Sequence, residues 1–324
     1  MKSCWIRAQA GKTVLEFRDI PVPQPKAGEI VVRMRASSLN RGELLAAIGL
    51  HSLDQPKPAG SDVAGEVHAV GEGVTKVKPG DRVMGRTRGA FAEYALMSVH
   101  QAVPMPQRLN WEQAAAVPTV FVTAWESLCQ YGRLDAGEWV LVAGASSGVG
   151  VACIQAAKVM GARVIGTSGS AAKLEQLQAL GLDIGIEVRG SGFAARALEA
   201  TGGKGVNLAV NLVGGSAFPD CLAALANQGR LAIVGYVDSA FSSEIDLSAV
   251  HARRLEIFGV SNMHLTPAER ASAMAGFVRD FLPAFGDGRI VPVVDKVFAF
   301  DELPAAKAYV DSNAQIGKVV VRMP

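Results

Sequence analysis

The sequence has few cysteines, and none of them is close to another. The four are Cys4, Cys129, Cys153 and Cys221, so there is no Cys-x-x-Cys pair to begin a zinc site of the usual spacing. A free cysteine behaves as a small hydrophobic residue. We therefore expect all four to be buried, reduced thiols.

Charge of one sign and long apolar runs are also scarce. The net charge is +2, which is too small to indicate a nucleic-acid or membrane-surface partner. No apolar run approaches the roughly 20 residues that span a bilayer, and residues 1–7 lack the apolar core of a secretory signal. We expect a cytoplasmic protein whose partners include neither nucleic acid nor a membrane.

The chain is long enough for two domains. Its 324 residues exceed the size at which a single hydrophobic core stops growing. Residues 1 to about 100 are predicted to be rich in β-strands, at 15–23, 28–36, 60–71 and 82–85, because apolar residues alternate with polar ones or Gly and Pro mark turns.

From about residue 111 the spacing of apolar residues becomes helical, and strands then alternate with helices. The predicted order is helix 111–116, helix 122–131, strand 139–143, helix 149–160, strand 162–167, helix 171–180, strand 206–211, helix 217–226, strand 229–234, helix 267–282, strand 290–298, helix 303–311 and strand 317–322. This alternation predicts an α/β fold with a doubly wound parallel sheet.

The stretch 140–158 predicts a dinucleotide-binding turn. A β-branched run, a turn of small residues and a helix follow one another there. Small residues let the backbone approach a pyrophosphate, and a helix N-terminus offers free N–H groups and the positive end of its dipole. The predicted contacts are Ala145, Ser146, Ser147, Gly148, Val149 and Gly150, of which Ala145 and Ser147 stand where a Gly-x-Gly-x-x-Gly fingerprint has its first two glycines.

The same turn also fits the Gly-x-x-x-Gly-x-Gly loop of short-chain dehydrogenases, as Gly144, Gly148 and Gly150. That family places the loop near its N-terminus and uses a Tyr-x-x-x-Lys pair. Here about 140 residues precede the turn, and no tyrosine has a lysine four residues later. We exclude this alternative.

Short segments along nearly the whole chain match one family in its own order. They are 37–41, 60–67, 70–71, 79–83, 89–94, 123–128, the glycine-rich turn, 213–215 and 316–321. On these segments the chain resembles the medium-chain dehydrogenase/reductase superfamily, in its zinc-free quinone oxidoreductase-like branch. The resemblance implies a GroES-like, β-rich catalytic domain over 1–120, completed by 266–324, and a Rossmann NADPH-binding domain over 121–265.

The positions that hold zinc in alcohol dehydrogenases of this superfamily are altered. Their early Cys region reads Ser38-Leu39-Asn40 here, their Gly-His-Glu motif reads Gly60-Ser61-Asp62, and the four-cysteine lobe expected after Gly85 is missing. The lone imidazoles of His51 and His68 have no co-ligands, and we expect them in a surface loop and on a strand face. We predict no metal site.

The end of the second strand of the nucleotide domain favours NADPH. NAD-specific units place a carboxylate there to hold the ribose hydroxyls, whereas this chain has Ser168, with Lys173 beyond it, and both are able to bind a 2′-phosphate. Lys173 alone is weak support, since exposed helix lysines are common. Many quinone oxidoreductases carry a Tyr after the next strand, where Val188 stands here.

Without a metal or a covalent nucleophile, the nicotinamide carries the chemistry. The resemblance implies that Asn40 faces the nicotinamide and that Thr123 contacts the cofactor. Asn40 is either a donor to a substrate carbonyl or to the cofactor, or a capping residue before a helix at 42–48. Arg41 is either a cation for an oxyanion or a solvated helix start. We take both as candidate catalytic residues.

Further cofactor contacts are expected at the carboxyl ends of later strands, where ligands of open α/β sheets bind. They are Val213, Gly214, Gly235, Tyr236, Ser261 and Asn262. Tyr236 either contacts the nicotinamide or is an ordinary loop aromatic. The stretch 255–260 is predicted to be the edge strand of the sheet, and because an exposed apolar edge promotes aggregation, we expect it to pair across a homodimer.

Together these expectations predict an NADPH-dependent reductase of quinones or α,β-unsaturated carbonyls. One alternative is a 2-enoyl-thioester reductase. Such an enzyme uses a Tyr just downstream of the Asn40 region, and residues 46–51 contain none. The other alternative is a redox-quiet NADPH-binding regulatory protein, because the motifs report cofactor binding rather than turnover.

Overall fold

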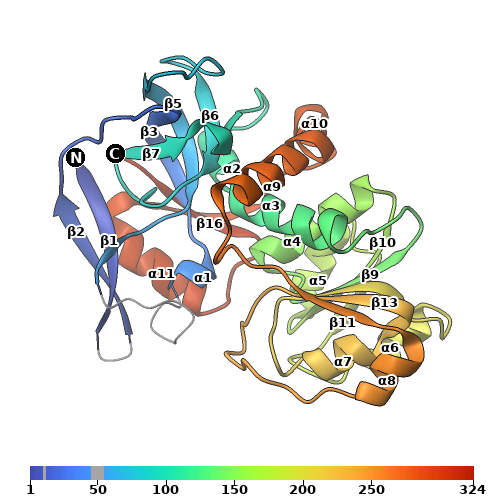
Figure 1. Ribbon diagram of the computed structural model, residues 1–324. Coiled ribbons are helices and arrows are strands. Elements are labelled where there is room, and N and C mark those ends of the chain that lie inside the picture. Colours follow the sequence, from blue (N-terminus) through green and yellow to red (C-terminus); the bar gives the residue numbers. More distant parts are fainter. Residues whose placement is uncertain (10–11, 45–54) are drawn as a thin grey trace. The chain divides into compact units, whose positions relative to one another are not determined.

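The structure of the protein is a computed structural model that describes residues 1–9, 12–44 and 55–324 (Figure 1). The chain forms two compact units. Unit 1 comprises Met1–Thr119, Arg270–Val278 and Val291–Pro324, and unit 2 comprises Val120–Glu269 and Arg279–Ile290. Of the residues that we expected with the first domain, residue 120 and residues 266–269 and 279–290 therefore belong to unit 2. No helix in the described ranges is long and apolar enough to cross a bilayer.

Unit 1 is built on two sheets. The larger has the strand order β15-β16-β3-β5-β6-β8, with β7 paired to β3, and the smaller has the order β2-β1-β4. The strands are β1 (Lys2–Gln9), β2 (Lys12–Asp19), β3 (Glu29–Ser38), β4 (Lys57–Pro58), β5 (Asp62–Val70), β6 (Arg82–Arg86), β7 (Tyr94–Ser98), β8 (Ala102–Pro104), β15 (Val294–Ala299) and β16 (Lys318–Arg322). Buried side chains of β3, β5 and β16, among them Met34, Val63 and Val321, form its apolar core.

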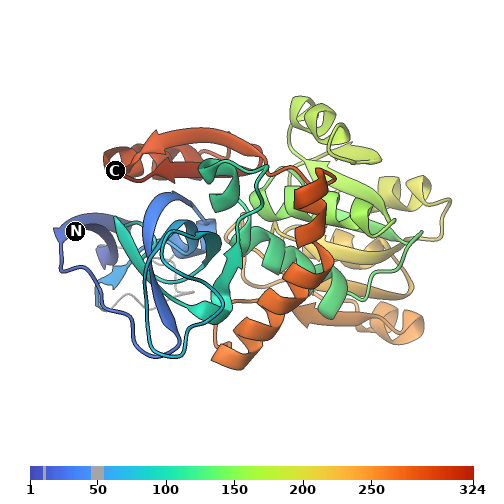
Figure 2. The same cartoon turned by 90° about the horizontal axis from the view of Figure 1, so that it is seen from above.

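Strands from opposite ends of the sequence lie side by side in unit 1. β16 runs antiparallel to β3, with Val320 opposite Ser38, and Leu39 N–H donates to Val319 O at 3.0 Å. Figure 2 shows these late strands (red) beside the early ones (blue). Lys318, at the start of β16, is thereby brought to the carboxyl end of β3.

Helices of unit 1 are short. They are α1 (Arg41–Leu44), α2 (Trp111–Ala115) and α11 (Leu303–Asp311), while α3 (Pro118–Trp125) and α9 (Pro267–Asp280) are shared between the two units. The helix predicted over 42–48 is present as α1, and the rest of that prediction lies outside the described residues, as does His51.

Unit 2 holds a six-stranded sheet in the order β11-β10-β9-β12-β13-β14, and every adjacent pair is parallel. Its strands are β9 (Trp139–Ala143), β10 (Arg163–Ser168), β11 (Ile184–Glu187), β12 (Val206–Asn211), β13 (Leu225–Ile233) and β14 (Glu256–Gly259). Its helices are α4 (Gly148–Val159), α5 (Ala171–Gln178), α6 (Ala194–Ala200), α7 (Phe218–Ala223), α8 (Leu247–Arg253) and α10 (Leu282–Asp287). The predicted α/β fold with a doubly wound parallel sheet is confirmed.

The order of the strands reverses at β9, and this reversal sets the position of a ligand site. From β9 the chain moves through β10 to β11 on one side, and then returns to β12, β13 and β14 on the other. Right-handed crossovers place α4 and α5 on one face and α6, α7 and α8 on the opposite face (Figure 1). The carboxyl ends of β9 and β12 therefore flank the switch point, where open α/β sheets bind ligands.

Unit 2 differs from the predicted pattern at several elements, among them α3 and β13. The helix predicted over 122–131 begins earlier, as α3, and continues as a π-helical turn over Glu126–Gln130, where the Ser127 hydroxyl donates to Thr123 O at 2.8 Å. β13 begins at Leu225, inside the predicted helix 217–226, because α7 ends at Ala223.

Candidate functional site

The glycine-rich turn between β9 and α4 (residues 144–150, the glycine turn below) is held by one serine. Ser147 has extended backbone angles and caps α4, since its hydroxyl oxygen accepts from Gly150 N–H at 3.1 Å. The same hydroxyl donates to Gly144 O at 2.9 Å. Gly144 has φ +86°, a conformation that favours glycine. The turn is thus closed by local hydrogen bonds and leads directly into the helix.

Gly150 cannot be replaced by a larger residue without a shift of the backbone. A Cβ atom there would lie 2.5 Å from Ala145 O and 2.6 Å from Gly144 O. The missing side chain leaves the first turn of α4, with its free N–H groups and the positive end of its dipole, open to an anion. Residues 144–150 therefore fit the pyrophosphate of a dinucleotide.

The loop after β12 is organised by Asn211. Its side-chain oxygen accepts from Val213 N–H and Gly214 N–H, both at 3.0 Å, and its amide donates to Gly214 O at 2.9 Å. Gly235 N–H, from the loop after β13, donates to Asn211 O at 3.2 Å. The predicted contacts Val213, Gly214 and Gly235 are thereby brought together beside the switch point.

Other predicted contacts in unit 2 make local interactions. The Tyr236 ring packs on Phe241 with centroids 5.1 Å apart. The Ser261 hydroxyl accepts from Met263 N–H at 3.1 Å, next to Asn262, and Thr123 is buried in α3. These contacts fix the side chains in place, and the roles in cofactor binding remain predictions.

A cation that was not predicted, Arg189, lies against the turn after β10. Ser168 ends β10 and is buried, and the Ser170 hydroxyl caps α5 by accepting from Lys173 N–H at 3.4 Å. The exposed side chain of Arg189 lies against this turn, because a Cβ atom at Gly169 would be 2.7 Å from Arg189 Cγ. Arg189 follows Val188 directly in the sequence. It reaches the turn after β10 because β11, a strand that we did not predict, pairs with β10.

In unit 1 a set of polar side chains surrounds a buried carboxylate. We call Ser38, Asn40, Glu43, Asp62 and Lys318 the Asp62 cluster. Asp62 Oδ2 accepts from Ser38 Oγ at 2.7 Å and Asn40 Nδ2 at 2.8 Å, and Lys318 Nζ lies 3.5 Å away. Asp62 Oδ1 accepts from the backbone N–H of Thr119 at 2.8 Å, in the first turn of α3. Asp62 and Lys318 are 0% and 5% exposed, so this is a buried ion pair.

The oxygen and both N–H groups of the Asn40 side-chain amide make hydrogen bonds within the cluster. Its oxygen accepts from Lys318 Nζ at 2.6 Å, and its two N–H groups go to Asp62 Oδ2 and to Glu43 Oε1, the latter at 2.9 Å. Donation to a substrate or to the cofactor, as predicted for Asn40, requires one of these bonds to break. The geometry supports a positioning role, and the predicted catalytic role is untested.

Arg41 is directed at the C-terminal end of α11. Its guanidinium donates to Val310 O at 2.8 Å and to the side-chain oxygen of Asn313. Burial lowers the pKa of this guanidinium, while Asp311 works in the opposite direction. The side chain joins two helices of unit 1, and its predicted role as a cation for an oxyanion also stays a prediction.

Glu43 is a member of the cluster that the sequence analysis missed. Burial, the largest effect, and the neighbouring Asp62 carboxylate raise its pKa to about 7, although contacts with Ser61, Asn40 and Lys318 work in the opposite direction. Burial also lowers the pKa of Lys318. The spacing Asn40-x-x-Glu43 was the available signal, because residues three apart face each other on a helix.

The Asp62 cluster does not fit a zinc ion. Zinc sites use Cys, His or carboxylate ligands, whereas Ser38 and Asn40 are neutral and the ammonium of Lys318 already neutralises Asp62. Within the described ranges no three His, Cys, Asp or Glu side chains are grouped so as to hold a metal. The four cysteines are free, and burial raises the pKa of Cys4 and Cys129 to about 12.

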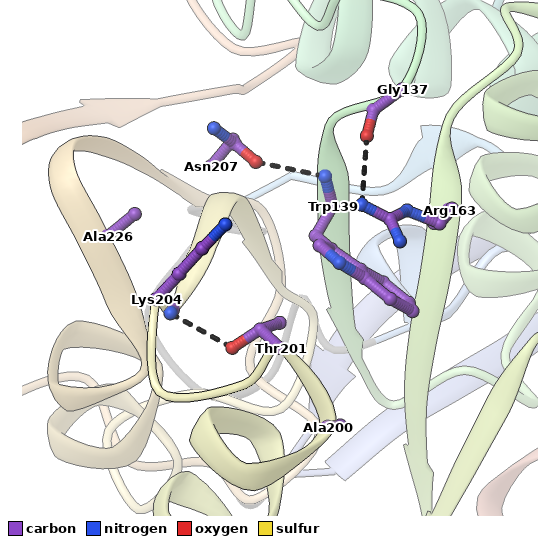
Figure 3. Close-up of a pocket in the computed structure, with 9 residues that line it drawn as sticks. Gly137, Trp139, Arg163, Ala200, Thr201, Lys204, Asn207 and Ala226 are labelled. Carbon is purple, nitrogen blue, oxygen red and sulfur yellow. Dashed lines mark hydrogen bonds between the residues drawn. The ribbon is translucent and has the colours of Figure 1, made fainter.

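A hollow of about 300 Å³ in unit 2 lies away from the glycine turn (Figure 3). Its lining includes Trp139 and Arg163, the first residues of β9 and β10, and Asn207 near the start of β12. Arg163 stacks on the Trp139 ring at 4.4 Å, and Trp139 N–H donates to Asn207 Oδ1 at 2.9 Å. It is therefore at the amino ends of the strands, opposite the edge where such sheets bind ligands.

Comparison with known proteins agrees with this arrangement. Residues 26–107 match the alcohol dehydrogenase GroES-like domain and residues 148–278 match the zinc-binding dehydrogenase family. The chain is 30% identical to a quinone oxidoreductase of Rattus norvegicus over 319 residues, which cover 96% of this chain and 94% of the relative. It is also 31% identical, over 96% of its length, to a Mycobacterium tuberculosis polyketide synthase subunit, of which it spans 14%.

Two solved structures share the whole fold. An NAD-dependent alcohol dehydrogenase is 32% identical, with a TM-score of 0.87 and 100% of both chains covered. A mycobacterial protein complexed with NADPH is 27% identical, with a TM-score of 0.90 and 99% and 100% of the two chains covered. The chain belongs to the medium-chain dehydrogenase/reductase superfamily, in its quinone oxidoreductase-like branch.

Proposed function

We propose that the protein is a zinc-independent, NADPH-dependent reductase that transfers a hydride to a quinone or an α,β-unsaturated carbonyl compound. The observation that carries the proposal is the glycine turn at the switch point, with Gly150 leaving the start of α4 open to a pyrophosphate. The Lys318 ammonium inside the Asp62 cluster supports a reaction without zinc, because it supplies the charge that balances Asp62.

The end of β10 supports NADPH over NADH. Ser168 provides no carboxylate to hold the ribose hydroxyls or to repel a 2′-phosphate, and Arg189 lies against the turn that follows it. An arginine near this position accommodates a 2′-phosphate in NADP-binding units. Lys173, at the start of α5, adds a second positive charge.

The division of labour follows from these positions. The nicotinamide, when bound, supplies the hydride. The glycine turn and the loop after β12 hold the dinucleotide. The 2′-phosphate is selected by Ser168, Lys173 and Arg189. The Asp62 cluster presents a fixed, desolvated set of dipoles. Preorganised dipoles stabilise developing charge better than water does.

The direct test is the loss of absorbance at 340 nm with NADPH and, separately, with NADH, against a panel of quinones and enones. We expect turnover with NADPH, and Arg189→Ala should raise the KM for NADPH roughly 10- to 150-fold, the equivalent of one charged hydrogen bond. The KM for NADH should not change. Arg196→Ala removes an exposed arginine of α6 in the same unit and is the matched control.

Different outcomes separate the alternatives. Turnover with NADH alone contradicts the proposed role of Arg189 and leaves the reductase activity standing. Turnover confined to 2-enoyl thioesters favours the enoyl-thioester reductase. Binding of NADPH without turnover of any acceptor favours the regulatory protein.

We also propose a homodimer that pairs through β14. This strand is the edge of the six-stranded sheet, and Ile257 and Phe258 on it are partly exposed. An exposed apolar edge favours pairing with another strand. Sedimentation of the purified protein gives the oligomeric state, and a monomer at micromolar concentration contradicts the proposal.

A further inference from the structure

We propose that Glu43 is the proton donor that completes the reduction of an α,β-unsaturated carbonyl compound, and that the Asp62 cluster keeps its carboxyl group protonated. This inference rests on the proposed function. It adds a residue with a defined step, because hydride addition to an enone yields an enolate that must still acquire a proton.

The geometry of Glu43 singles out one oxygen. Oε1 accepts from Asn40 Nδ2 at 2.9 Å, whereas Oε2 is buried and makes no hydrogen bond of normal geometry with any residue that the structure describes. A contact with the Ser61 side chain, outside that geometry, lowers the pKa of Glu43 but by less than burial raises it. Buried polar atoms are nearly always paired, so an exception needs an explanation. A carboxyl O–H that is held for a substrate provides one.

The surroundings of Glu43 favour its neutral form. The Asn40 amide donates both to Glu43 and to the buried carboxylate of Asp62, on β5. Two carboxylates so close together disfavour each other's negative charge. Lys318, on β16, is the cation that faces the cluster, but its ammonium hydrogen bonds go to Leu39 O and Asn40 Oδ1, at 2.8 and 2.6 Å. Arg41, also on α1, points to α11 instead. The cluster therefore neutralises Asp62, and no cation of the described residues makes a hydrogen bond with the Glu43 carboxyl group.

The position is consistent with the predicted site. Asn40 was placed by resemblance on the nicotinamide side, and Glu43 lies one helical turn after it. Asn40 then acts as a positioning residue, since its amide connects Asp62, Lys318 and Glu43. Glu43 itself is partly exposed although Oε2 is buried.

The proposed step balances as follows. The hydride enters at the β-carbon and leaves an enolate. The O–H bond of Glu43 breaks, the enolate electron pair forms a C–H bond at the α-carbon, and Glu43 is left as a carboxylate. A proton from water restores the acid before the next turnover. The sum is one hydride and one proton added across the C=C bond.

The main test compares the wild type with Glu43→Gln, which keeps the size of the side chain and an acceptor for Asn40. With an enone, kcat at pH 7 should fall roughly 10²- to 10⁴-fold, the usual contribution of a general acid. Wild-type kcat should fall as the pH rises through about 7, because Glu43 loses its proton there, and the variant should lack this decrease. Quinone reduction should fall much less, since its oxygen atoms take protons from water.

Two further measurements do not depend on the rate. In D₂O the wild type should place deuterium on one face of the α-carbon of an α-methyl enone, whereas the variant should label both faces. In the cofactor-free protein, carbon-13 NMR of labelled Glu should show one carboxyl signal that titrates near pH 7 and is absent from Glu43→Gln. Glu72→Gln, at an exposed position in unit 1, is the matched control and should behave as the wild type.

The outcomes distinguish the two proposals. A wild type that reduces enones, with a Glu43→Gln variant equal to it in rate, pH profile and facial selectivity, overturns the role of Glu43 alone. A Glu43 signal that titrates near 4 also overturns it. A wild type that reduces no acceptor overturns the proposed function, and the proton-donor role falls with it.

Discussion

The Asp62 cluster of unit 1 and the glycine turn of unit 2 are formed by different kinds of groups. The Asp62 cluster of unit 1 consists of buried and partly buried polar side chains, and its two buried charges, on Asp62 and Lys318, form an ion pair. The glycine turn of unit 2 consists of backbone groups and of residues with little or no side chain. The Asp62 cluster should therefore be sensitive to changes of charge, and the glycine turn to changes of volume.

The largest loss of stability is expected when the cation of the Asp62 cluster is removed. Lys318→Met should lower the free energy of unfolding by about 3–5 kcal/mol, because it leaves Asp62 as a buried carboxylate with no cation. Chemical denaturation followed by tryptophan fluorescence measures the loss. Lys307→Met removes a lysine of a surface pair with Asp311 and should cost about 1 kcal/mol or less.

The double variant Asp62→Asn, Lys318→Met tests whether the loss of stability comes from a charge that is left unpaired. Because neither charge is then left alone, its loss of stability should be smaller than the sum of the two single losses. If Lys318→Met is no worse than Lys307→Met, the cluster is not held by charge pairing.

The glycine turn should respond to a single methyl group. Gly150→Ala places a Cβ atom 2.5 Å from Ala145 O, and we expect a loss of about 1–3 kcal/mol from overpacking, together with weaker NADPH binding. Titration of NADPH fluorescence measures the affinity. Gly286→Ala is the matched control, because a Cβ atom there meets nothing within 4 Å and an alanine in a helix should be neutral or stabilising.

The smallest expected effect concerns the cap of α4. Ser147→Ala removes the acceptor of Gly150 N–H, and N-cap losses of this kind cost about 1 kcal/mol. Ser170→Ala at α5 should cost less, since its contact with Lys173 N–H is longer, at 3.4 Å. Equal losses at both caps would show that the Ser147 hydroxyl has no particular role in the turn. Thermal unfolding is sufficient to compare the two variants.

Features that depend on consecutive residues could be predicted from the sequence. The glycine turn, β9 and α4 occupy consecutive residues, so the change from a β-branched run to a turn of small residues and then to helical spacing predicts all three. The strand β11 was missed because its four residues, Ile184–Glu187, include a glycine and a glutamate and carry a weak pattern. Arg189, which follows it, was missed for the same reason.

The Asp62 cluster could not be predicted because its members are far apart in the sequence. Asp62 and Lys318 are separated by 256 residues, and they meet through the pairing of β16 with β3 and of β3 with β5. The resemblance placed Asn40 at the nicotinamide, but it did not show that Asp62, Lys318 and Glu43 already use its amide.

The separation of Asp62 from Lys318 also has a consequence for the newly made chain. Ribosomes add roughly 5–20 residues per second, so the 256 residues between the two take roughly 13–50 s to synthesise. During that interval β5 and β3 are available to fold, while the strand that carries the balancing ammonium does not yet exist. A nascent chain that ends before β16 therefore either exposes the Asp62 carboxylate to water or folds around an unpaired charge, which is strongly destabilising.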